Sequence, residues 1–167
     1  GIPQKIVFGL MDINDRKQAE KTLAKQKRIL AQAEALAELG SWEWDLNQNT
    51  VWWSEEVYKQ FGFDNKDYEP TYEKFLTCVH PDDVELVHQA LEKTVQGSGT
   101  YSMEHRIVRA DGNERIVQQR AEVIRNISGE PIQMIGTIQD ITESRRKEQQ
   151  LKEQALRLKS QAELLDL

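Results

Sequence analysis

The spacing of apolar residues changes along the chain and divides it into zones. Residues 15–39 contain no Gly or Pro and are rich in strong helix formers, which predicts a long helix. From Thr100 onward apolar and polar residues alternate in three runs separated by turn formers at 110–113 and 126–131, which predicts an antiparallel meander. Residues 142–167 return to helical spacing. The pattern therefore predicts a domain of strands and helices between two long helices.

The region before Thr100 combines two short strands with short helices. The runs SWEWDL and NTVWWS flank an Asn-rich turn and predict a hairpin, and Gly40 is expected to end the preceding helix. Ser54 and Gly62 suit the two ends of a short helix. Two strands, short helices and three longer strands predict an α+β fold with the helices on one face of the sheet.

The run HPDD at residues 80–83 is expected to open the next helix. Pro81 suits the first helical position, and Asp82 and Asp83 suit the positive end of a helix. A metal or acid–base site is the alternative interpretation, but helix initiation explains all of these residues. We therefore predict no metal site.

Both long helices carry narrow apolar stripes. Leu23 and Leu30 lie seven residues apart in the first helix, and Leu151, Leu158 and Leu165 alternate with alanines in the last. Stripes this narrow are typical of a helix–helix seam, so we expect a homodimer through both helices, parallel or antiparallel. The alternative is that the helices pack on their own domain.

Two segments of the chain are similar to each other. The run KIVFGLMDINDR at residues 5–16 aligns without a gap with QMIGTIQDITES at residues 133–144, and Gly1 and Pro3 align with Gly129 and Pro131. Such repetition at about one domain length is typical of a tandem array. The first copy would then be a strand without its sheet, which must pair, swap, join the helix or stay disordered.

Five runs in order resemble the landmarks of a PAS domain of the WxWD and HPDD type. They are LGSWEWDL, WWSEEVYKQFGF, VHPDDVELV, MEHRIVRADGNERIV and MIGTIQDITE, within residues 39–143. The resemblance implies a five-stranded antiparallel sheet with helices on one face, and a role in sensing or signal relay. Proteins of this family commonly place the domain between helical linkers that lead to a histidine kinase, as in two-component systems, or to a diguanylate cyclase.

The resemblance also implies a domain plan. Residues 1–14 are expected to be the remnant of the last strand of a preceding PAS domain, and residues 15–39 a linker helix that forms a coiled coil, as the C-terminal helix is also expected to do. Residues 40–141 are the PAS domain, and residues 142–167 a signalling helix. Neighbouring PAS and output domains of the parent chain are thus expected partners.

The run Asp140, Ile141 and Thr142 resembles the strand-to-helix junction of this family. There the Asp holds the linker to the sheet and the Thr caps the outgoing helix. We expect these residues to couple the domain to its output, and the alternative is a plain helix cap.

A ligand would bind between the sheet and the short helices. From strand parity we expect its pocket to include Phe75, His88, Leu91, Met103, His105, Met134 and Ile138.

We predict no cofactor. His88 lies on a helix resembling the one that supplies the iron ligand in haem-holding members, but a lone His beside an apolar face is usually structural. Cys78 lacks the Asn and Arg neighbours of the reactive Cys in flavin-binding members, so it is expected to be a buried thiol. The four Trp residues are expected in the core, where one of each pair can cover a neighbouring helix, and a ligand cage is the alternative.

The composition of the chain limits the classes of partner that it can bind. A net charge of -6 argues against nucleic acid, and a single Cys excludes an internal disulfide and favours the cytoplasm. The chain has no apolar run long enough for a membrane span, so we expect no direct membrane contact from this piece, and it has no phosphate loop or nucleophile elbow, so we expect no catalysis in it. A relay module is therefore the favoured function, with a small-ligand receptor and a passive dimerisation spacer as alternatives.

Overall fold

The computed structural model describes residues 4–97 and 99–165, which divide into two units. The first unit runs to Ala37 and the second begins at Glu38. Each is described by itself below.

The first unit is one helix, α1, which spans Gln4–Leu36. The described part of residues 1–14 is therefore helical, while residues 1–3 lie outside the described residues. A strand with no neighbour leaves its backbone groups without partners, whereas a helix pairs them within the segment. Of the alternatives left open for this segment, the structure has the one in which it joins the helix. Its origin in a preceding PAS domain stays a prediction.

The second unit is built on an antiparallel sheet, which has five strands within the described residues. They are β1 (Leu39–Asp45), β2 (Thr50–Trp53), β3 (Thr100–Val108), β4 (Glu114–Arg125) and β5 (Pro131–Asp140). The spatial order is β2-β1-β5-β4-β3, so the last strand lies between the first strand and the fourth. The predicted α+β class and five-stranded sheet are confirmed.

Gly40 does not end a helix, contrary to the sequence-based expectation. It lies within β1, while the turn is made by Glu38, which has a positive φ of 50°. Gly40 is required for another reason, because a Cβ atom there would lie 2.5 Å from Cγ2 of Val57. The glycine thus allows the second helix of the chain to approach β1.

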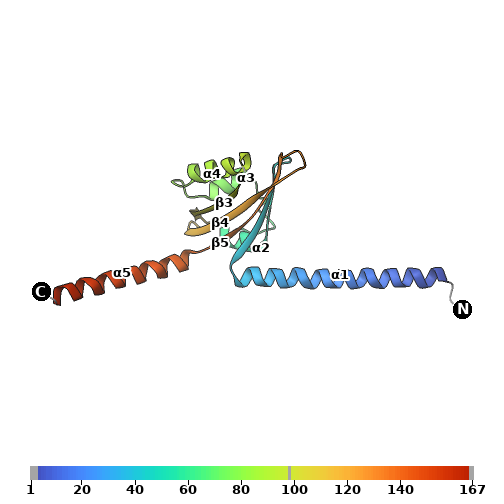
Figure 1. The fold of residues 1–167 in the computed structure, drawn as a ribbon, viewed down its shortest axis with the longest axis horizontal. Coiled ribbons are helices and arrows are strands. Elements are labelled where there is room, and N and C mark those ends of the chain that lie inside the picture. Colours follow the sequence, from blue (N-terminus) through green and yellow to red (C-terminus); the bar gives the residue numbers. More distant parts are fainter. Residues whose placement is uncertain (1–3, 98, 166–167) are drawn as a thin grey trace. The chain divides into compact units, whose positions relative to one another are not determined.

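Three short helices cover one face of the sheet. They are α2 (Glu55–Phe61), α3 (Tyr72–Cys78) and α4 (Val84–Gln96), and α3 and α4 lie together over the sheet in Figure 1. Gly62 ends α2 in the left-handed conformation, with φ of 77°, as its sequence position predicts. The largest fully buried side chains fill the space between the layers: Phe61, Ile107, Met134, Ile138, Val57, Val87 and Val117.

The HPDD run is not the first turn of a helix. α4 begins at Val84, and Pro81–Asp83 form a turn before it. Asp83 does not cap α4 with its side chain but accepts hydrogen bonds from the backbone N–H of Arg106 at 2.8 Å and from its Nε and Nη2 at 3.0 and 2.7 Å. The acid therefore attaches the start of α4 to β3. These bonds lower the pKa of Asp83 to about 2.

We predict that Asp83→Asn lowers the free energy of unfolding by about 1–2 kcal/mol at pH 7, since a charged bidentate pair is lost. The folded pKa lies below that of the unfolded carboxyl, so this stabilisation is present above pH 4 and is lost as pH falls toward 2. Urea unfolding at pH 7 and at pH 3 measures both effects. Asp82→Asn is the matched control, because the Asp82 carboxylate is exposed and lies 3.9 Å from Arg106. An equal loss in the two variants would contradict the assignment.

Candidate functional site

A small cavity lies between the sheet and the helices and is walled mainly by aromatic side chains. Its volume is about 30 Å³. A cavity of this size holds one or two water-sized groups. The residues that line it are Trp42, Trp44, Val51, Trp53, Val57, Phe61, Tyr72, Phe75, Leu91, Gln119 and Ile138.

Trp42 is held over the sheet by a glycine on the neighbouring strand. A Cβ atom at Gly136 would lie 2.6 Å from Cζ2 of Trp42, so only Gly allows the indole to lie there. Trp42 is only 7% exposed, and its Nε1 has no hydrogen-bond partner among the described residues. A buried donor without a partner is costly, so this atom is a natural contact for an acceptor.

Gln119 is the polar group in the cavity wall. Its Oε1 lies 3.0 Å from Nε2 of His105 and 3.5 Å from the Tyr101 hydroxyl. Burial lowers the pKa of His105, which favours the neutral ring and a hydrogen bond from Nε2 to Gln119. Burial likewise raises the pKa of Tyr101. This wall is therefore an uncharged hydrogen-bond network.

The edge of the cavity is a stack of two aromatic rings. Trp44 and Tyr72 lie parallel with centroids 4.3 Å apart, and the Tyr72 hydroxyl lies 2.8 Å from Nδ1 of His88. The other ring nitrogen of His88, Nε2, is 3.4 Å from Glu92. Burial raises the pKa of Tyr72 to about 12, so it stays protonated. Both ring nitrogens of His88 thus take part in contacts with neighbouring side chains at the surface.

Only some of the residues that were predicted to form the pocket line the cavity. Phe75, Leu91 and Ile138 line the cavity. His105 lies behind Gln119, and His88 behind Tyr72. The remaining two, Met103 and Met134, belong to the surrounding core.

Sequence reasoning missed the aromatic wall and Gln119. Trp42 and Trp44 pair with Gly136 and Met134, so they share the inward face of β5 with Ile138. Strand parity therefore indicates that both indoles face the pocket, although their sequence favours the core over a ligand cage. Trp52 has the opposite parity and is 54% exposed, so the prediction that the four Trp residues are core holds only in part.

The end of β5 is tied to the start of the last helix, α5, which spans Thr142–Leu165. Thr142 is 4% exposed, and both its backbone N–H and its hydroxyl donate to Oδ1 of Asp140, at 2.9 and 2.6 Å. The hydroxyl also accepts from the backbone N–H of Ile116 on β4 at 2.9 Å. The backbone N–H of Ile141 donates to the Ile116 carbonyl at 2.8 Å.

The geometry of Thr142 differs from the expected helix cap. Its hydroxyl bonds to β4 and to Asp140, and Thr142 is itself the first residue of α5. Arg115 lies 4.0 Å from the Asp140 carboxylate on the other side. The junction thus attaches the helix to two strands at once.

The predicted seam residues of both long helices are exposed. They are Leu23, Leu30, Leu151, Leu158 and Leu165. The three leucines of α5 therefore do not pack on the domain to which that helix belongs.

Other features of the described residues bear on chemistry. No group of three or more His, Cys, Asp or Glu side chains among them is placed to hold a metal ion. None of the helices in this part of the chain has the length and apolar character needed to cross a membrane. Cys78 is buried, which raises the pKa of its thiol, and Sγ lies 3.4 Å from the Lys74 carbonyl.

Comparison with known proteins identifies sensor relatives. The chain is 26% identical over 122 residues to the sensor protein FixL of Bradyrhizobium diazoefficiens, and the match covers 73% of this chain and 24% of FixL. It is similar in structure to a sensory box histidine kinase/response regulator from Burkholderia thailandensis, with 28% identity, a TM-score of 0.63 and coverage of 77% of this chain and 95% of that one. The chain thus spans about a quarter of the length of FixL.

The prediction of no cofactor is contradicted by another solved structure. A Light-Oxygen-Voltage domain studied with a flavin analogue matches with a TM-score of 0.53 and 19% identity, over 75% of this chain and 94% of that one. The fold is thus shared with a domain that was studied with a flavin analogue, so the sequence around Cys78 and His88 does not exclude a cofactor.

The cavity of this chain is much smaller than a cofactor. Pockets for drug-sized ligands measure about 300–1,000 Å³, whereas this cavity has about 30 Å³. A flavin or haem does not fit among the aromatic side chains as they lie.

The family follows from the fold together with a match to a family model. The model described as the PAS fold matches residues 50–138, which is more than half of the chain. This segment includes β2, the three short helices and the three long strands up to Ile138. The resemblance noted in the sequence is thereby confirmed, and the chain belongs to the PAS fold family.

Proposed function

We propose that this PAS domain is a sensory and signal-relay module that dimerises through α1 and α5 and passes a signal to a downstream output domain. The observation that carries the proposal is the junction at Thr142. Its buried hydroxyl links α5 to β4 and to the end of β5. A helix attached in this way must respond when these strands move.

The route from the core to the helix is short. Ile138 lines the cavity, and Asp140 follows two residues later on the same strand. Two residues of strand span about 7 Å. A change in the packing around Ile138 would therefore displace Asp140 and, through it, Thr142.

The exposed leucines support dimerisation. α5 has 24 residues, and every described residue from 149 to 165 is exposed. A helix with this little packing is marginal by itself, and a repeating apolar stripe is what a second helix covers. Two packings of one helix pair differ by only a few kcal/mol, which suits a switch.

The output domain lies beyond this chain. Similarity to a sensory box histidine kinase/response regulator favours a histidine kinase, and a diguanylate cyclase is the alternative. We place the module in the cytoplasm, next to the other domains of its parent protein.

We predict that Leu158→Glu raises the dimer dissociation constant more than tenfold, because it buries a charge in the seam. Leu156→Glu is the matched control, since both leucines are exposed, at 64% and 66%, and only Leu158 lies on the stripe. Sedimentation equilibrium at micromolar concentration measures the effect. Dimerisation through α5 is wrong if wild type is monomeric or if the two variants behave alike.

We predict that Asp140→Ala uncouples α5 from the sheet, since it removes the acceptor of both Thr142 bonds. Amide hydrogen exchange in the first turn of α5 should accelerate about tenfold, while the melting temperature falls by only a few degrees. Asp140→Asn keeps an acceptor oxygen and should exchange at an intermediate rate. If the parent protein with Asp140→Ala still switches its output as the wild type does, the coupling role is wrong.

A second function, small-ligand binding, is favoured by the unpartnered Nε1 of Trp42. Trp42 and Gln119 both line the cavity, and the indole Nε1 is buried. A small ligand with an acceptor atom would satisfy the indole N–H. A larger ligand would require Tyr72 and Trp44 to move apart.

If such a ligand binds, Trp42→Phe should weaken its affinity about tenfold, because the indole N–H is removed while most of the ring remains. Native mass spectrometry and an absorbance spectrum of the purified chain test for a bound compound. Trp52→Phe is the control, since Trp52 is exposed and does not line the cavity. A chain that carries no compound and that no small-molecule screen stabilises would exclude this function.

A further inference from the structure

The direction of α5 is controlled by a second contact, one turn beyond Thr142. The side chain of Arg145 makes a bidentate ion pair with Glu104 on β3, with Nε 3.0 Å from Oε2 and Nη2 in contact with Oε1. Residues three apart lie on the same face of a helix, about 4.5 Å along its axis. Thr142 and Arg145 therefore attach this face to two different strands.

One attachment point leaves a helix free to pivot, whereas two points separated by a turn define its direction. Beyond Glu148 every described residue of α5 is exposed. Arg145 and Glu104 are 43% and 38% exposed, so the pair contributes modestly to stability. Its geometry is nevertheless restrictive, because two of the three nitrogens of the planar guanidinium are bound to one carboxylate.

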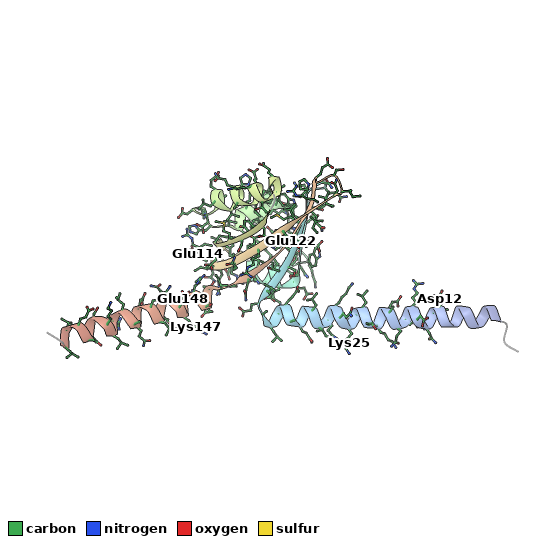
Figure 2. All side chains as sticks on the ribbon, in the orientation of Figure 1. Asp12, Lys25, Glu114, Glu122, Lys147 and Glu148 are labelled. Carbon is green, nitrogen blue, oxygen red and sulfur yellow. The ribbon has the colours of Figure 1, made fainter. Side chains whose placement is uncertain are left out.

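The same arginine also contacts the beginning of the dimer stripe. Arg145 pairs with Glu148, and Lys152 pairs with Glu148 from the next turn, at 2.8 Å. Glu148 lies seven residues before Ala155, in line with the stripe of Leu151 and Leu158. Figure 2 labels Glu148 on the first turns of α5, close to the domain. In a parallel pair of helices two Glu148 carboxylates would approach each other, and Arg145 and Lys152 neutralise them.

We propose that Arg145 is a positioning residue that couples β3 to the dimer stripe of α5 through Glu104 on one side and Glu148 on the other. This inference rests on the proposed relay function for its consequence, while the attachment itself is a property of the single chain. Glu104 lies beside His105, whose ring belongs to the wall network of the cavity. β3 thus provides a second route from the core to α5, separate from the route through β5 and Thr142.

The attachment is tested by the distance between two spin labels on one chain. Labels at Asn47→Cys in the β1–β2 turn and Gln154→Cys on α5, in a Cys78→Ala background, are measured by double electron–electron resonance with a tenfold excess of unlabelled chain. We expect Glu104→Gln and Arg145→Gln each to widen the distance distribution about twofold. The combined swap Glu104→Arg with Arg145→Glu should restore the narrow distribution.

Two control variants carry the same kinds of change without touching the pair. Glu122→Gln removes an acid from β4, and Lys147→Gln removes a base from α5, and both residues are labelled in Figure 2. Neither should change the distribution. The inference is overturned if the Glu104 or Arg145 variant keeps the wild-type width, if the controls widen equally, or if the swap stays wide.

Two further measurements separate this inference from its alternatives. If circular dichroism shows that a variant does not fold, the wild-type chain is measured in 1 M NaCl instead. The Debye length there is about 3 Å, so the salt should weaken the ion pair and widen the distance distribution without a mutation. If the salt leaves the width of the distance distribution unchanged, the inference is overturned. In a Leu158→Glu background the chain is expected to be monomeric, and widening by Glu104→Gln there supports the attachment even if dimerisation proves wrong.

Discussion

The pairing of β5 with both β1 and β4 is the constraint on which the second unit depends. β5 is the last strand in the chain but a central strand in the sheet, so its inward residues are covered from both sides. Leu39, the first residue of β1, pairs with Gln139, the penultimate residue of β5. The chain therefore enters the sheet beside the point where it leaves, and Asp140 and Thr142 lie at that point.

Small residues allow this sheet to carry large aromatic ones. Gly136 on β5 and Ala121 on β4 lie opposite each other and across from Trp42, so the indole lies over them instead of displacing the helices. The same indole leaves one buried N–H without a partner, which is the most unusual polar atom of the cavity wall. Close packing and an unsatisfied donor thus have a common cause.

The acids of the HPDD run show where local rules stopped predicting correctly. Pro81 and two acids match a helix start, yet the helix begins later, because Asp83 makes three hydrogen bonds to Arg106 that its own helix could not offer. Arg106 is 23 residues away in the sequence, and nothing in the local pattern points to it. Gly40 is similar, since its role is set by Val57 and not by the helix before it. In both positions a tertiary contact outweighed a local preference.

The sequence by itself determined the class of fold, the two helical stripes and the strand-to-helix junction, because periodicity and turn residues act over a few positions. It also placed Phe75, Leu91 and Ile138 on inward faces, which the cavity then shares. Only the tertiary structure decided which side chains surround the cavity and that Arg145 meets Glu104. These depend on strand order and register, which join residues about 40 to 100 positions apart and leave no periodic trace in the sequence. The physical reason is that local patterns determine which face of a helix or strand a residue lies on, whereas strand pairing determines which distant residues it contacts.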